Sequence, residues 1–186
     1  MKYQPVLLTM TILMSVGLLL TGASRCVYAQ EPAHLTVIGN VVKPNRPAYD
    51  QFQDAFFKFR DKEFKKAYEF SHDELASLPQ TTITAHAKTW PAPIVVTGPT
   101  LQTVLRAAGA ASNKKISFVA LDGYTVDLDA ASEQLETWIV GISVNSRPLG
   151  IGGRGPVWML QETGSKTVGE DVEARWVWST FLISID

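Results

Sequence analysis

The sequence predicts an α+β protein that consists of a single β-rich mixed domain with a few short helices. Roughly 155 of the 186 residues follow a leader-like N-terminus, which is enough for one domain with a self-sufficient core. Short apolar segments with strand-like alternation recur along this part, and 46% of all residues are hydrophobic, which argues against disorder. The helical patterns are too few and too irregularly spaced for a doubly wound sheet.

Residues 1–29 have the pattern of a signal peptide. Lys2 gives a positively charged start, the stretch from Val6 to Leu20 is mostly apolar, and Val27-Tyr28-Ala29 ends in the small-residue pattern of a cleavage site. We therefore expect an exported protein whose single domain comprises residues 30–186, without membrane insertion after cleavage.

Two other interpretations of this N-terminus are weaker. A membrane anchor needs an apolar run of about 18 residues, and Thr9 and Thr11 interrupt a run that is already shorter. A lipoprotein could be anchored through Cys26, but Arg25 directly before it fits a lipidation signal poorly.

Charge and cysteine content exclude several classes of protein. A formal net charge of -1 and a pI near 6.3 give no basic surface for nucleic acid or an anionic membrane. Cys26 is the only cysteine, so cleavage would leave a chain without a thiol. Export permits disulfides, but such a chain can form none and must rely on an ordinary core.

The first strand is expected at Leu35-Thr36-Val37-Ile38-Gly39, followed by a polar, proline-bearing connector from Lys43 to Pro47. Residues 48–70 then combine charges with phenylalanines, three of which have helical spacing: Phe52, Phe56 and Phe59. This segment is either a partly helical flap over the core or a surface for a protein partner.

A short helix is expected after Ser71, because Ser71-His72-Asp73-Glu74 fits a capping box, and Pro79 should end it. Strands are expected from Thr81 to Ala85 and from Ile94 to Val96, before a turn at Gly98-Pro99. Thr100 should cap the next helix, whose apolar face and stop are Leu101, Val104, Leu105, Ala108 and Gly109.

The C-terminal half is expected to be mostly strands. Ile116 to Leu121 and Tyr124 to Leu128 flank the turn Asp122-Gly123 and predict a hairpin. The remaining expected elements are a short helix from Ala130 to Leu135 and strands from Trp138 to Val144, Val157 to Leu160 and Trp176 to Ile185.

Several short motifs occur in an order that resembles a known family. They are Leu78-Pro79-Gln80-Thr81-Thr82-Ile83-Thr84, Trp90-Pro91, Gly98-Pro99 before Leu101 and Leu105, Ala120-Leu121-Asp122-Gly123-Tyr124, and Arg154-Gly155-Pro156-Val157-Trp158. Over roughly Leu35 to Ile185 the chain resembles the oxidoreductase molybdopterin-binding domain, which has the fold of the sulfite-oxidase middle domain. The order and spacing of the motifs carry this resemblance, rather than any one of them.

The resemblance also implies where a metal-binding cysteine would lie. In the molybdenum enzymes of this family it lies in the strand leading into the Trp and Gly-Pro region, and alignment on Trp90 and Thr97-Gly98 places it near His86. A neutral imidazole supplies neither the charge nor the soft sulfur of a thiolate. We therefore expect neither molybdenum nor the family's redox reaction, and His86 is either a ligand contact or a polar loop residue.

The resemblance further implies a cleft shaped for a pterin without a metal. A pterin is flat, apolar on both faces and rich in donors and acceptors at its edge, so it needs an aromatic wall and a few polar groups. The candidate wall residues, each of which could instead be core, are Trp90, Tyr124, Trp158, Trp176 and Trp178.

The candidate polar groups are Arg154, with its planar guanidinium, and Asp122, as an acceptor for the amino edge, although both could be solvated turn charges. His86, Thr84 and Gly153 complete the candidate pterin site. Gly153 belongs to a glycine-rich run from Gly150 to Gly155 that satisfies G-x-G-x-x-G.

That run is not expected to bind a dinucleotide, because Pro148 precedes it and a strand rather than a helix follows. It could still bring backbone N–H groups and Arg154 close to a ligand. His34, His72 and His86 lack the close spacing of a zinc site.

Small exported members of this family without the cysteine resemble periplasmic pterin-binding regulators. The resemblance therefore implies a non-catalytic periplasmic sensor for a reduced, tetrahydropterin-like, non-metallated pterin. It implies, as partner, the periplasmic domain of a membrane-bound cyclic-di-GMP enzyme, a diguanylate cyclase or phosphodiesterase, with an influence on biofilm formation. Residues 48–70 are the candidate partner-binding insertion. The alternatives are a molybdopterin-dependent periplasmic oxidoreductase, with His86 or water at the metal, and a structural adaptor without ligand.

Overall fold

The computed structural model describes residues 31–110 and 115–186, so the predicted signal peptide lies outside the described residues. Glu31–Asp186 form one compact unit. Short strands dominate it and its helices are few and short, which confirms the prediction of a β-rich mixed domain.

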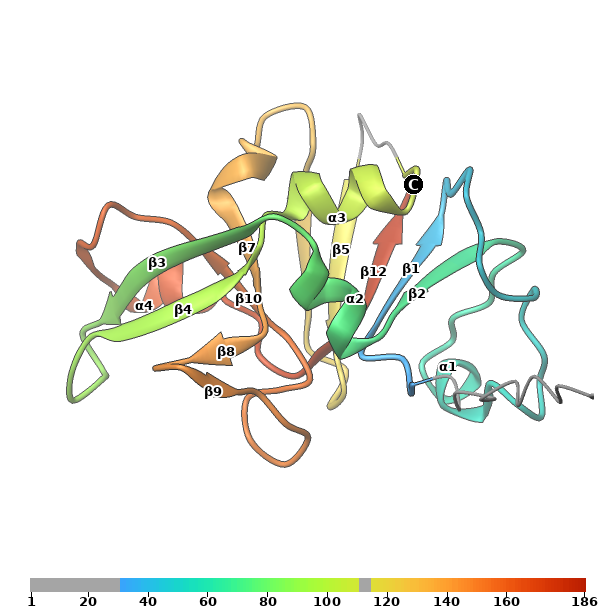
Figure 1. Cartoon of the computed structure of the whole chain (residues 1–186), viewed down its shortest axis with the longest axis horizontal. Helices are drawn as coiled ribbons and strands as arrows, with labels where there is room; N and C mark the ends of the chain where they lie inside the picture. Colours follow the sequence, from blue (N-terminus) through green and yellow to red (C-terminus); the bar gives the residue numbers. More distant parts are fainter. Residues whose placement is uncertain (1–30, 111–114) are drawn as a thin grey trace, which may run out of the picture. The chain divides into compact units, whose positions relative to one another are not determined.

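The first sheet has five strands in the order β2-β1-β12-β5-β6 (Figure 1). They are β1 (Leu35–Gly39), β2 (Ala67–Phe70), β5 (Lys115–Ala120), β6 (Thr125–Asp129) and β12 (Thr180–Ile185). β1 and β12 run parallel, and the other neighbours are antiparallel. The first and last strands of the unit therefore pair directly, with Val37 opposite Ile183.

The second sheet has the order β11-β3-β4-β8-β9. Its strands are β3 (Gln80–Ala87), β4 (Ile94–Pro99), β8 (Ser143–Val144), β9 (Arg147–Pro148) and β11 (Thr167–Val168). β3 and β4 form a hairpin whose connection carries Trp90 (Figure 1). A separate antiparallel pair consists of β7 (Trp138–Gly141) and β10 (Trp158–Gln161).

Two of the helices, α2 and α3, begin at side-chain caps that the sequence predicts. They are α1 (Ala55–Phe59), α2 (His72–Ser77), α3 (Leu101–Ala107), the 3₁₀ turn η1 (Leu135–Thr137) and α4 (Glu170–Glu173). The capping box of α2 is confirmed: the Glu74 N–H donates to Ser71 Oγ at 3.1 Å, and the Ser71 N–H donates to Glu74 Oε2 at 2.8 Å. Thr100 caps α3, also as predicted. Within residues 31–110 and 115–186, no helix has the length and apolarity that a membrane crossing requires.

Two hydrophobic clusters hold these elements together. The larger includes buried residues of both five-stranded sheets, α3 and the β7–β10 pair, among them Val37, Val96, Leu101, Trp138 and Trp158. The smaller covers β1, β5 and β12 with residues of the 48–70 segment: Ile38, Phe57, Phe64, Ala67, Val119, Phe181 and Leu182.

The 48–70 segment is only partly the flap that the sequence predicts. Its helix is α1, but residues 67–70 form β2 and pair with β1 inside the first sheet, because Ala67 and Phe70 are buried there. The Arg46 guanidinium bonds to Asp54 at 2.5 Å and to Glu69 at 2.6 Å, which ties both ends of the segment to the connector before it.

Three predicted elements between Gly98 and Val144 are wrong. Gly98-Pro99 is not a turn but the end of β4, paired with Thr81 and Gln80 of β3. The expected helix from Ala130 to Leu135 is a turn that leads into η1. The expected strand from Trp138 to Val144 is divided at Ile142, because β7 pairs with β10 while β8 pairs with β4.

The strand expected to begin at Trp176 begins at Thr180. Trp176 follows α4 and Trp178 lies in a turn, so they do not share the face of a strand as their alternation predicts. Trp176 is buried, whereas Trp178 is 46% exposed. This irregular segment matters for the site described below.

Gly98 allows β4 and β7 to approach closely. A Cβ atom at Gly98 would lie 2.0 Å from the Val140 carbonyl oxygen, a distance that only a backbone shift could relieve. We predict that Gly98→Ala lowers the free energy of unfolding by about 1–3 kcal/mol, measured by urea denaturation. Gly150→Ala is the control, since nothing lies within 4 Å of that position, and equal losses in the two variants would contradict the close approach.

Candidate functional site

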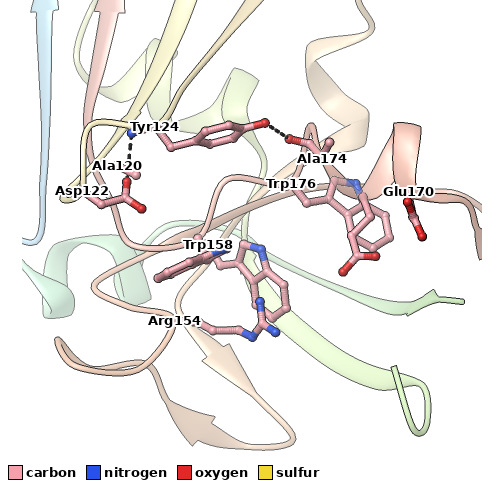
Figure 2. A pocket seen from close by; sticks show the side chains of 10 residues that line it. Ala120, Asp122, Tyr124, Arg154, Trp158, Glu170, Ala174 and Trp176 are labelled. Atoms are coloured by element: carbon pink, nitrogen blue, oxygen red, sulfur yellow. Dashed lines mark hydrogen bonds between the residues drawn. The ribbon is translucent and has the colours of Figure 1, made fainter. Parts of the chain in front are cut away.

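Several residues that the sequence analysis selects meet around one cavity of about 360 Å³, here called the tryptophan cavity (Figure 2). It lies between the β5–β6 turn, the start of β10, and α4 with the loop that follows it. Its lining residues are Ala120, Asp122, Tyr124, Arg154, Trp158, Glu170, Glu173, Ala174, Trp176 and Trp178.

The β5–β6 turn forms one wall of the cavity. Asp122 Oδ1 accepts a hydrogen bond from the Tyr124 N–H at 2.9 Å, which shapes the turn. The Tyr124 hydroxyl donates to the Ala174 carbonyl at 2.7 Å (Figure 2). Tyr124 therefore joins the hairpin to the segment after α4, while half of its surface remains exposed.

A cluster of three tryptophans supports the cavity. The Trp90 ring packs against those of Trp158 and Trp176, with centroids 5.4 and 5.5 Å apart. Trp90 Nε1 donates to Glu173 Oε1 at 2.6 Å, and Thr89 Oγ1 donates to Glu173 Oε2 at 2.6 Å. Both oxygens of Glu173 thus hold the β3–β4 connection against α4.

Two of these indoles have no hydrogen-bond partner. Trp158 and Trp176 are 2% and 3% exposed, and their Nε1 atoms find no acceptor in the part of the chain that the structure describes. An unpaired buried donor costs about 1–3 kcal/mol. Both side chains line the tryptophan cavity, but their Nε1 atoms are enclosed by the protein, so the cavity meets other atoms of these indoles.

Arg154 supplies the cavity's cationic side chain. Its guanidinium lies 4.4 Å from the Trp158 ring centroid and 5.8 Å from that of Trp90. The backbone is fixed, since the Ser179 N–H donates to the Arg154 carbonyl at 2.8 Å, but the side chain is exposed. Three carboxylates line the same cavity, on Asp122, Glu170 and Glu173, so donors and acceptors are both available to a ligand.

Trp90 itself borders a second hollow of about 450 Å³, here called the proline groove. It is lined by Trp90, Pro91, Ala92, Pro93, Ile94, Val144, Asn145, Leu149, Arg154 and Trp158. Arg154 and Trp158 line both hollows, so they form the boundary between them.

Three predicted site residues line neither hollow. His86 lies on β3, with Nδ1 2.9 Å from the Thr167 hydroxyl of β11, and Thr84 lies on the same strand opposite Val95. Gly153 is exposed on its loop, and its carbonyl accepts from the Ser179 hydroxyl at 3.3 Å. The structure thus brings together Asp122, Tyr124, Arg154 and Trp178, with Trp90 adjacent to them.

Three lining residues, Glu170, Glu173 and Ala174, are not among the site residues predicted from the sequence. A local signal was present, because Gly169 followed by Glu170 and Asp171 suits the start of a helix with an acidic first turn. Nothing local indicates that Glu173 meets Trp90, which lies 83 residues earlier.

The cavity's chemistry is that of hydrogen-bonding groups and aromatic faces. Among the described residues no three His, Cys, Asp or Glu side chains are grouped so as to hold a metal ion. Because the only cysteine is Cys26, residues 31–186 provide no thiolate. These residues suit a flat organic ring better than a thiolate-bound metal.

The fold has similar counterparts among solved structures. No family model and no curated protein matches the sequence. The crystal structure of the sulfane dehydrogenase SoxCD from Paracoccus pantotrophus is similar, with a TM-score of 0.53 and 14% sequence identity. The match covers 85% of this chain but 39% of that one, so this chain spans well under half of its neighbour. At this identity the likeness shows the fold alone.

Glu173 should contribute more to the stability of the cavity wall than Glu170, which lies three residues earlier in α4. We predict that Glu173→Ala lowers the free energy of unfolding by about 1–3 kcal/mol, because Trp90 and Thr89 lose their acceptor. Glu170→Ala, on the same short helix, should change it by less than about 0.5 kcal/mol. Thermal or urea unfolding measures both, and equal effects would show that the Glu173 bonds do not hold the wall.

Proposed function

We propose that this protein is a periplasmic sensor that binds a reduced, non-metallated pterin in the tryptophan cavity. On this proposal the protein binds the periplasmic domain of a membrane-bound cyclic-di-GMP enzyme and regulates it according to whether the cavity holds a ligand. It thereby influences biofilm formation. The observation that carries the ligand is the aromatic lining of a cavity that also holds three carboxylates and Arg154.

The chemistry of a tetrahydropterin complements this lining. Its carbonyl and ring nitrogens accept hydrogen bonds, which the Arg154 guanidinium can donate. Its amino and ring N–H groups donate, and the carboxylates of Glu170 and Asp122 can accept. A cavity of about 360 Å³ lies within the range of roughly 300–1,000 Å³ typical of small-molecule sites.

Two further observations support this reading. The motifs from Leu78 to Trp158 resemble the molybdopterin-binding domain, and the fold resembles a solved dehydrogenase structure, so a sulfite-oxidase-like fold is the finer assignment that we propose. The described chain lacks a cysteine, which favours recognition of the organic ring over metal chemistry.

A molybdopterin-dependent oxidoreductase is the second candidate, favoured by the dehydrogenase named as structural neighbour. The two proposals differ in one measurable quantity. Protein purified from its native host should contain no stoichiometric molybdenum if it is a pterin sensor, whereas a one-to-one content by elemental analysis would favour the oxidoreductase. A structural adaptor, the third candidate, predicts neither molybdenum nor pterin affinity.

Tetrahydrobiopterin, titrated calorimetrically under reducing conditions, tests the ligand. We predict that Arg154→Gln and Trp178→Ala each weaken binding by about tenfold, or ~1.4 kcal/mol, through loss of a charged donor and of an aromatic wall. Both side chains are exposed, so the fold should survive their replacement.

The matched controls lie outside the cavity lining. Arg147→Gln on β9 and Ile151→Ala, at a residue that is 79% exposed, should leave the affinity unchanged. No binding by the unmodified protein at ligand concentrations near millimolar would exclude the pterin proposal.

A further inference from the structure

Three phenylalanines around α1 face solvent and form what we call the aromatic patch. Phe52, Phe56 and Phe59 are 85%, 41% and 73% exposed. Single exposed apolar residues are ordinary, but three large ones lie within eight positions of the chain here, and exposed apolar groups of this kind commonly mark an interaction site.

The opposite side of this segment is firmly anchored. Phe57 and Phe64 are buried in the smaller hydrophobic cluster, where the Phe57 ring packs on Phe181 with centroids 5.6 Å apart. The Arg46 guanidinium lies 4.7 Å from the Phe64 ring centroid while it pairs with Asp54. The aromatic patch is therefore presented by a packed scaffold, not by a loose loop.

The charges beside the patch are mostly positive. Between residues 58 and 62 there are three cationic side chains, Lys58, Arg60 and Lys62, and one carboxylate, Asp61. No ion pair involving the two lysines occurs within residues 31–110 and 115–186. The complementary surface is an apolar recess with an acidic rim.

Arg60 connects the aromatic patch to the β5–β6 turn. Its guanidinium lies 5.4 Å from the Phe56 ring centroid and 5.1 Å from that of Phe59. The same group donates through Nη2 to the Leu121 carbonyl. A Cβ atom at Gly123 would lie 2.5 Å from Arg60 Nη1, so the guanidinium rests directly on the turn.

That turn is also the wall of the tryptophan cavity, because Asp122 and Tyr124 line it. A second contact links the patch to the other side of the cavity: Phe56 packs edge-on against Phe181, at 4.9 Å between centroids. Phe181 lies on β12, three residues after the cavity residue Trp178. A ligand that orders the β5–β6 turn therefore acts on the contact with Arg60, and one that orders the Trp178 segment acts on the contact between Phe181 and Phe56.

We infer that the aromatic patch is the surface through which this chain contacts a partner protein with an apolar, acid-rimmed recess, and that Arg60 couples this surface to occupancy of the tryptophan cavity. The coupling half rests on the proposed function, because it takes a pterin as the ligand of the cavity. The surface half stands on the exposure and charge of the patch alone.

Hydrogen exchange with and without tetrahydrobiopterin tests the coupling. In the unmodified protein and in the control Arg147→Gln, ligand should slow amide exchange at residues 55–60 at least threefold. In Arg60→Gln the ligand should still bind in calorimetry while this slowing is lost. If Arg60→Gln does not fold, Arg60→Lys replaces it, because lysine keeps the charge but not the planar fork. The same result is expected: the ligand binds, but the slowing of exchange at residues 55–60 is lost. Bound ligand with unchanged exchange at 55–60, or a normal response in the Arg60 variant, overturns the coupling.

Absence of pterin binding would instead overturn the proposed function and the coupling with it, while leaving the surface to a separate test. A photo-crosslinking residue placed at Phe59 in the native host should give a discrete adduct with another protein, whereas one at the remote, exposed Ile151 should not. The doubly reversed variant Lys58→Glu with Lys62→Glu should abolish the adduct, and Lys166→Glu should retain it.

Three results would overturn the surface half. They are no adduct at Phe59, an adduct that survives reversal of both lysines, and an adduct only with a second copy of this chain. The first denies the surface, the second denies the acidic rim, and the third replaces a partner protein with self-association.

Discussion

The packing of Trp90 between Trp158 and Trp176, fixed by the bond from Trp90 Nε1 to Glu173, is the interaction on which the site depends. It joins the β3–β4 connection, the start of β10 and the end of α4, three segments that are distant in sequence. The tryptophan cavity occupies the side of this cluster that the β5–β6 turn approaches but does not fill. Without the cluster, neither the cavity nor the proline groove would keep its wall.

The three indoles differ in their hydrogen bonding. Trp90 has a carboxylate acceptor, whereas the Nε1 atoms of Trp158 and Trp176 have no partner among the described residues. Buried donors are paired in the great majority of native structures, so two unpaired ones in one cluster are unusual. Both Nε1 atoms are enclosed by the protein, so what favours a ligand is the aromatic lining, Arg154 and the three carboxylates of the cavity.

Local signals predicted local structure well. The capping box at Ser71, the cap at Thr100 and the hairpin around Asp122-Gly123 depend on neighbouring residues, and all three are present. Gly98 was misread as a turn because its role, contact with Val140 of β7, exists only in the folded chain. The cavity was partly predictable: Asp122, Tyr124, Arg154 and Trp178 line it. His86 and Thr84, however, lie on β3 and do not line the cavity. Glu173 contributes by accepting a hydrogen bond from Trp90, a contact that exists only in the folded chain.

The indole N–H signals of the five tryptophans offer the most direct test of the central claim, that a pterin is recognised by the tryptophan cavity. In a nitrogen–proton correlation spectrum, the Nε1–H signals of Trp158 and Trp176 should shift as tetrahydrobiopterin saturates the protein, because the ligand ring binds against these two indoles. The signal of Trp138, whose Nε1 already donates to Glu133 at 3.1 Å and which does not line the cavity, should stay in place. Saturation that leaves Trp158 and Trp176 unmoved would contradict this account.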